Sequence, residues 1–112
     1  MGEENTRENL NREEKISERK RENDNIIFVG GKPLVNYIRA VMTQFTKWNA
    51  SEVIIKSRGK FISKAVDVAE VAKRSIENKN VQVKGISIAS ESFETEGKKT
   101  NISTMDIVLA AS

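Results

Sequence analysis

A cluster of cations occupies the segment from Lys56 to Lys60, where a run of apolar residues ends and a helical pattern begins. Arg58 can grip a phosphate with its planar guanidinium, while Lys60 and Lys64 supply compact positive charges. Gly59 allows the backbone to come close to a ligand, and the N–H groups at a helix start add partial positive charge. This combination predicts a phosphate-binding loop.

A second candidate loop is the Gly30-Gly31-Lys32 turn, followed one helical turn later by Asn36. Both loops follow apolar strands, and the carboxyl ends of parallel strands meet at the edge of a sheet where α/β proteins bind ligands. We therefore expect Lys32 to lie near Arg58 and to add a third phosphate contact. Asn36 would add a hydrogen bond.

Two further lysines, Lys98 and Lys99, lie at the predicted tip of a β-hairpin near the end of the sequence. They are candidate contacts to a nucleic-acid backbone. Acidic residues outnumber them from position 91 onward, so we expect the hairpin to bind a polyanion weakly; these acids are Glu91, Glu94, Glu96 and Asp106.

The composition excludes several kinds of chemistry. The sequence contains no cysteine and no histidine, so disulfides are impossible and the usual ligands of zinc, copper, haem and iron–sulfur sites are missing. The commonest general base near neutral pH is also absent. We therefore predict no catalytic residues, no metal, no cofactor and no small-molecule substrate. An enzyme that used Asp67 as its base is an alternative, although Asp67 is more simply a charge on a helix surface.

The charges divide the chain in two at Asn25. Residues 1–24 carry a net charge of −2 and only three large apolar side chains, whereas the remaining 88 residues carry +5. Too few apolar groups are present in residues 1–24 to offset the entropy of ordering them. The sequence thus predicts a disordered, charged tail over residues 1–24 and a single nucleic-acid-binding domain over residues 25–112. With no long apolar run and a charged start, the protein is expected to be soluble and cytoplasmic, without membrane contact.

The hydrophobic periodicity predicts the order β-α-β-α-β-β. Strands are expected at 26–29 and 53–55, helices at 33–49 and 61–78, and a hairpin with arms at 81–93 and 101–110. The alternation of apolar residues changes parity at Gly85, which predicts a bulge there. Two strand–helix–strand crossovers followed by a hairpin predict an α+β fold, in which a four-stranded mixed sheet carries both helices on one face.

The second helix suggests how copies of the chain associate. Its core-facing stripe is expected to comprise Ile62, Ala65, Val66, Ala69, Ala72 and Ile76. Val68 and Val71 lie outside this stripe, which leaves a second apolar surface that a monomer would expose to water. The small core of so short a chain also favours association. We therefore predict a homodimer.

Three blocks of sequence resemble the Alba family. They are Val29-Gly30-Gly31-Lys32-Pro33-Leu34-Val35-Asn36-Tyr37, the stretch from Ile54 to Asp67, and Thr100-Asn101-Ile102-Ser103-Thr104-Met105-Asp106-Ile107. The resemblance implies a dimeric archaeal chromatin protein that binds double-stranded DNA, and RNA, with little sequence preference. It also implies that the hairpin follows the duplex and that dimers meet near Ile76, forming higher assemblies along DNA. The family commonly has two lysines where this chain has Gly31-Lys32, so one cation is missing here.

The leading hypothesis is a chromosome-associated protein that coats and compacts nucleic acid through phosphate contacts, without reading base sequence. An RNA-binding scaffold subunit of an RNA-processing ribonucleoprotein, such as RNase P, is the alternative.

Overall fold

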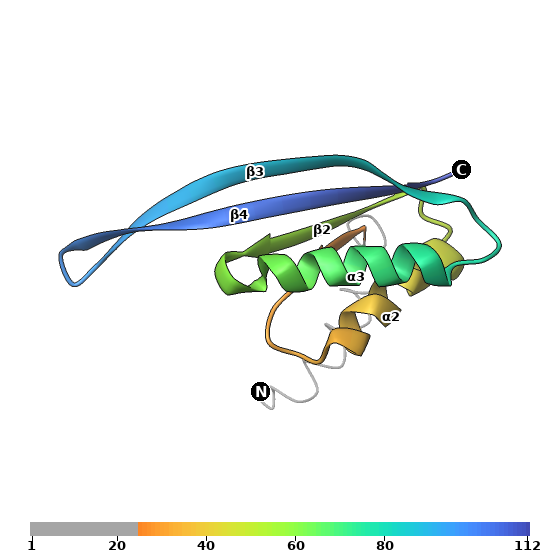
Figure 1. Cartoon of the computed structure of the whole chain (residues 1–112), viewed down its shortest axis with the longest axis horizontal. Coiled ribbons are helices and arrows are strands. Elements are labelled where there is room, and N and C mark those ends of the chain that lie inside the picture. The colour runs from red at the N-terminus through yellow and green to blue at the C-terminus, as the bar shows by residue number, and fades with distance from the viewer. Residues whose placement is uncertain (1–24) are drawn as a thin grey trace, which may run out of the picture.

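The computed structural model describes residues 25–112, so the expectation of a disordered tail over residues 1–24 lies outside the described residues. The described part folds in the expected order (Figure 1). Its elements are β1 (Ile26–Phe28), α2 (Leu34–Thr46), β2 (Glu52–Arg58), a 3-10 turn (Gly59–Phe61), α3 (Ile62–Ser75), β3 (Val81–Thr95) and β4 (Lys98–Ala111). Within residues 25–112, no helix has the length and apolar character needed to cross a membrane.

The strands form one sheet in the order β1-β2-β4-β3. β1 and β2 are parallel, and β4 runs antiparallel to both of its neighbours. β2 and β3 therefore run in the same direction, as two crossovers require, with β4 inserted between them. Both helices lie on one face of this sheet (Figure 1), which confirms the predicted α+β architecture.

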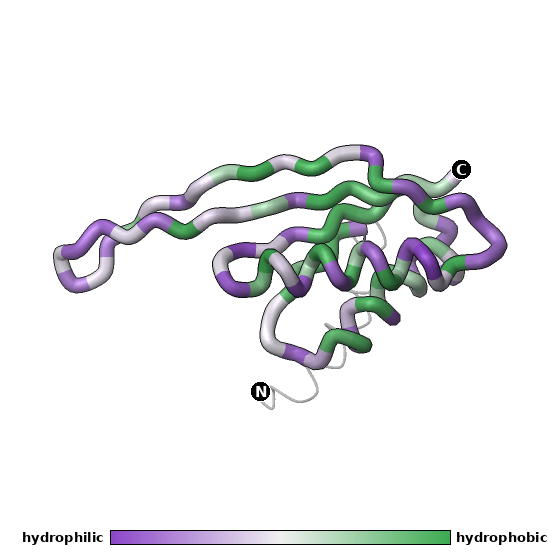
Figure 2. The backbone as a smooth tube through the Cα atoms, in the orientation of Figure 1, coloured by the Kyte–Doolittle hydropathy of each residue, from purple (hydrophilic) through white to green (hydrophobic). Residues whose placement is uncertain are grey.

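The core lies between the helices and the face of the sheet that they cover. On that face, Val53 and Ile55 of β2 stand opposite Leu109 and Ile107 of β4, and all four are buried. Phe45 of α2 fills the space above them, and burial of a side chain of this size contributes about 2 to 3 kcal/mol. Figure 2 shows hydrophobic residues concentrated where the helices cover the sheet, while the far end of the β3–β4 hairpin is largely hydrophilic.

The predicted bulge is present where the apolar parity changes. Val83 pairs with Leu109 and Gly85 pairs with Val108, so Lys84 is the extra residue on β3. Beyond this point Ile86 stands opposite Ile107 and Ile88 opposite Met105. Because directly paired residues point to the same side of a sheet, the bulge brings both isoleucines onto the helix-covered side.

The hairpin is longer than the sequence predicts. Its strands extend to Thr95 and Lys98 and are joined by a two-residue turn, Glu96–Gly97. Both turn residues have positive φ angles, 53° and 79°, which matches the twist of paired strands. The hairpin therefore forms an arm that projects beyond the helices (Figure 1).

The expected stripe on α3 is wrong at two positions. Val68, expected on an outer surface, is fully buried in the core, and Val66, expected in the core, is 40% exposed. The side that faces the sheet is centred on three alanines and Val68, because small side chains allow the helix to pack closely against the strands; the alanines are Ala65, Ala69 and Ala72.

Ile76 follows the last residue of α3, and the implied contact between dimers near it stays a prediction. The residue itself belongs to the core and is only 6% exposed, so it offers very little surface to a neighbouring dimer. A carboxylate introduced there would be buried among apolar groups, at a cost of several kcal/mol. The change Ile76→Asp would therefore destabilise the subunit itself.

Candidate nucleic-acid interface

Lys64 holds the two predicted loops together. Its ammonium Nζ donates a hydrogen bond to the carbonyl oxygen of Gly30, at 2.7 Å, and another to the carbonyl oxygen of Lys32. The first turn of α3 is thereby attached to the loop between β1 and α2. This confirms that the two loops lie side by side.

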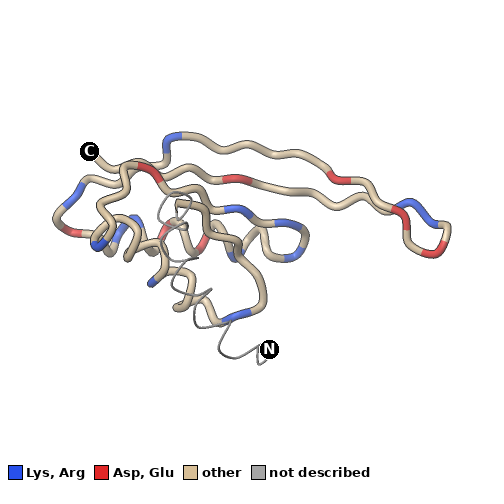
Figure 3. The backbone as a smooth tube through the Cα atoms, turned by 180° about the vertical axis from the view of Figure 1, so that it is seen from behind, with Lys and Arg blue, Asp and Glu red and all other residues tan. Residues whose placement is uncertain are grey.

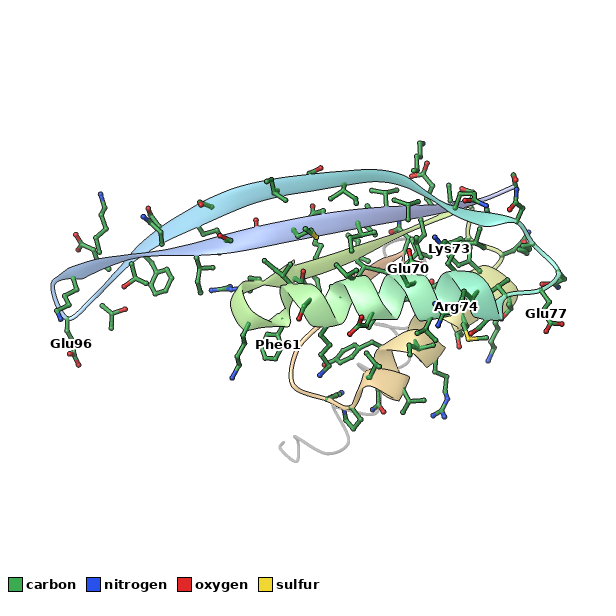
Figure 4. All side chains as sticks on the ribbon, in the orientation of Figure 1. Phe61, Glu70, Lys73, Arg74, Glu77 and Glu96 are labelled. Atoms are coloured by element: carbon green, nitrogen blue, oxygen red, sulfur yellow. The ribbon has the colours of Figure 1, made fainter. Side chains whose placement is uncertain are left out.

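Two aromatic rings surround the Lys64 ammonium. The ring of Tyr37 lies 5.3 Å from Nζ and that of Phe61 lies 5.8 Å away, within the range of cation–π attraction. Figure 4 shows Phe61 at the start of α3, next to the β1–α2 loop. Both rings are partly buried against the core, so they pack around Lys64 rather than stand free.

The hydroxyl group of Tyr37 fixes the backbone of the same loop. It accepts a hydrogen bond of 3.1 Å from the backbone N–H of Lys32. This hydrogen bond lowers the pKa of Tyr37, and the positive charges of Lys64 and Lys32 act in the same direction. The backbone of Lys32 is thus held at its N–H group by Tyr37 and at its carbonyl group by Lys64. The residue nevertheless remains exposed to solvent.

Arg58 ends β2, and Gly59 turns the chain into α3. Gly59 has a φ of 57°, in the left-handed region that side chains other than glycine rarely adopt. This turn leaves Lys60 exposed beside the start of the helix. We call Lys32, Arg58 and Lys60 the basic rim. Figure 3 shows the basic residues gathered at the loop between β2 and α3.

Lys56, the remaining cation of the loop, is already neutralised. Its Nζ lies 2.9 Å from a carboxylate oxygen of Asp106, the residue directly opposite on β4. Both side chains are about one-third exposed. Lys56 therefore adds less positive potential than its place in the sequence suggests.

A carboxylate from a distant part of the sequence faces Arg58, although nothing in the sequence pattern links it to this loop. A carboxylate oxygen of Glu91, on β3, lies 3.7 Å from a guanidinium nitrogen of Arg58, and both side chains are more than half exposed. An ion pair this open to water is worth about 1 kcal/mol or less. Glu91 is thus a weakly held partner of Arg58, and the guanidinium group remains open to water.

Glu91→Gln is expected to strengthen binding of duplex DNA by about threefold to tenfold at low salt, because the phosphate no longer competes with a carboxylate for Arg58. Titration of a labelled duplex by fluorescence anisotropy measures the change. Glu77→Gln, just beyond the end of α3 that lies away from the basic rim (Figure 4), removes the same charge and is the matched control. Equal gains in both variants would mean that Glu91 acts only through net charge.

The hairpin lysines lie apart from the basic rim. Lys98 and Lys99 begin β4, opposite Thr95 and Glu94 at the far end of the arm. Figure 4 places Glu96 at this tip, and Figure 3 shows both acidic and basic residues there. The structure therefore brings together Lys32, Arg58, Gly59, Lys60 and Lys64, with Asn36 exposed in the first turn of α2 nearby. It does not bring Lys98 and Lys99 to them.

Comparison with known proteins is consistent with this architecture. The family model for Alba matches residues 25–90. A protein named DNA/RNA-binding protein Alba from Methanococcus maripaludis is 49% identical over 88 residues, covering 77% of this chain and 97% of that protein. A protein of the same name from Methanoculleus marisnigri is 50% identical over 86 residues, covering 77% of this chain and 92% of the relative.

A solved structure gives the same result. Alba from Thermoplasma volcanium superimposes with a TM-score of 0.68 at 45% sequence identity, over 76% of this chain and 98% of that one. The strand order, the helix-covered face, the projecting hairpin and the sequence matches agree: this chain belongs to the Alba family.

Proposed function

We propose that this protein binds double-stranded DNA and RNA without reading base sequence, and that it coats and compacts them as a homodimer associated with the chromosome. The observation that carries the proposal is the basic rim, in which two loops held together by Lys64 present three exposed cations. The relatives named DNA/RNA-binding protein Alba support the same assignment.

The groups in the rim favour phosphate contacts over base contacts. Arg58 and Lys60 flank a glycine turn at the start of a helix, where a phosphate can approach both side chains and backbone N–H groups. Phosphate contacts position a protein on nucleic acid but carry no sequence information. Lys64 serves this site by holding the Lys32 loop, and Asn36 is proposed to add a hydrogen bond.

Exposed apolar residues on the helix-covered side of the sheet support a homodimer. Ile86 and Ile88 are 59% and 74% exposed, although they face the same side as buried Ile107. Val66 exposes apolar surface on α3 as well. An apolar surface of this kind, continuous with a core, is typical of a subunit interface, and a second copy of the chain would cover it.

The arm is proposed to add a weaker contact through Lys98 and Lys99. The two lysines begin β4 on one side of the turn, while Glu94 and Glu96 lie on β3 and in the turn. The mixture of charges limits attraction to a polyanion at long range, although each lysine can still reach a phosphate at short range.

The salt dependence of binding tests this mechanism. Three rim contacts per subunit give about six phosphates per dimer, so the slope of log affinity against log salt should be near −5. Binding should weaken roughly a thousandfold between about 50 and 200 mM salt, and by the same factor for duplexes of unrelated sequence. A strong preference for one folded RNA over all duplexes would instead support the scaffold role in an RNA-processing particle.

A further inference from the structure

The sheet face opposite the helices contains a groove of about 350 Å³ that the basic rim does not account for. It crosses the strands from β1 to β3, and its lining includes Phe28, Lys56, Arg58, Glu91, Thr104 and Asp106. Its polar walls are formed by two ion pairs, Lys56–Asp106 and Arg58–Glu91. The groove is therefore a charged channel with an aromatic side chain at one end.

Phe28 is the unusual residue of this groove. It is 70% exposed, although phenylalanine is among the residues most often buried in the core. It stands in register with Lys56 on β2, whose side chain points away from the helices, so Phe28 presents its ring on the open face. The ring is not part of the hydrophobic core, and it forms a flat apolar surface in the groove.

Phe28 also lines a second hollow, on the other side of β1. This hollow, of about 610 Å³, is lined by Lys32, Asn36 and Tyr37 as well. Phe28 thus lines two hollows, one shared with Arg58 and the other shared with Lys32, both of the basic rim. A flexible chain of phosphates could follow this path with one base placed over the ring.

We propose that Phe28 is a stacking site for one base of single-stranded nucleic acid, whose flanking phosphates are held by Lys32 and Arg58. The inference rests on the proposed function, because it uses the same two cations. Exposed aromatic rings on a four-stranded sheet are a common platform for unpaired bases, and every base offers a π-face to such a ring. A duplex cannot use the ring, since its bases are already paired and stacked.

The charges of the groove favour this occupant over a second copy of the chain. Four of the side chains that line it are ionised groups in two partly exposed ion pairs, and burial of these pairs under an apolar surface would be costly. A phosphate can replace Glu91 at Arg58, whereas an apolar partner leaves Arg58 without a new ligand. A single strand supplies both a base that can stack on Phe28 and a phosphate that can bind Arg58.

Phe28→Leu and Phe28→Tyr separate stacking from simple apolar contact. F28L keeps an apolar side chain without a π-face, whereas F28Y keeps the ring. We expect F28L to weaken binding of a short oligodeoxythymidylate by roughly tenfold, and F28Y to bind it as the unchanged protein does. Binding of a DNA duplex, measured by the same anisotropy titration, should be unchanged in both variants.

Three outcomes would overturn the stacking site. The first is single-strand binding unaffected by F28L, and the second is an equal loss for single strand and duplex. The third is a change in sedimentation of F28L, which would make this face a contact between subunits. Failure of the unchanged protein to bind duplex would overturn the proposed function instead, and Phe28-dependent single-strand binding in that protein would still support the stacking site.

A fluorescence measurement gives an independent readout. The sequence contains a single tryptophan, Trp48, so the double variant F28W/W48F carries its only indole in the groove. Stacking of thymine on this indole should quench its emission upon addition of the oligodeoxythymidylate, while the duplex should leave it unchanged. Binding of the single strand without quenching would place the bases elsewhere and overturn the proposal.

Discussion

Arg58→Ala is expected to reduce the affinity for duplex DNA by about a hundredfold at roughly 100 mM salt. A dimer loses two charge-assisted contacts, each worth about 1.5 kcal/mol or more. It should also flatten the plot of log affinity against log salt by about two units, because two fewer counterions are released. Anisotropy titrations at several salt concentrations provide both quantities.

The matched control is Arg74→Ala. Arg74 lies in the last turn of α3, at the end of the helix away from the basic rim (Figure 4), and its loss changes net charge by the same amount. This variant should retain the slope of the unchanged protein. All duplex sequences should lose affinity equally in Arg58→Ala. Loss of binding to one sequence alone would show that Arg58 reads a base edge, and the coating mechanism would then be wrong.

Ile88→Asp is expected to raise the dissociation constant of the dimer by about a hundredfold or more. A two-fold symmetric interface contains every residue twice, so this change places two carboxylates against apolar surface that cannot solvate them. Analytical ultracentrifugation at micromolar concentration measures the shift from dimer to monomer. The secondary structure should remain intact, because Ile88 is largely exposed within the subunit.

Ala89→Asp adds the same charge one residue farther along β3. Ala89 pairs with Thr104, so it points to the open face of the sheet, opposite to Ile88. This control should remain dimeric. A dimer that survives Ile88→Asp, or that dissociates equally in both variants, would place the subunit interface on another surface.

The periodicity of the sequence predicted the element order and the bulge because these features depend on neighbours along the chain. Apolar alternation must change parity where a residue is added to a strand, and Gly85 lies at that point. The helix boundaries were less accurate. The first helix ends at Thr46 rather than near Asn49, where a positive φ of 57° turns the backbone toward β2.

The error at Val66 and Val68 has a different origin. On an alanine-rich helix, positions three and four apart produce two overlapping stripes, and both fit the same hydrophobic period. The centre of the buried face is then decided by how the helix lies on the sheet. This is a tertiary property, and the sequence of the helix alone does not contain it.

The candidate site likewise contains features that are contiguous in sequence and contacts between residues that are distant in sequence. The glycine turn and the cations around Arg58 are contiguous in sequence, so they could be recognised directly. The Arg58–Glu91 pair could not, because it depends on the register of β4 between the strands that carry the two residues. The reach of Lys64 back to Gly30 likewise depends on the path of the β1–α2 loop.

The position of β4 between β2 and β3 fixes the order in which the sheet can assemble during synthesis. β3 leaves the ribosome before the strand that will join it to the sheet, and until β4 follows, the core lacks Ile107 and Leu109. A chain arrested at that stage presents unpaired strand edges, which readily associate with other chains. The two-residue Glu96–Gly97 turn adds almost nothing to this interval, which ends as soon as β4 is synthesised, because a hairpin closes within about 1 to 10 μs once both strands exist.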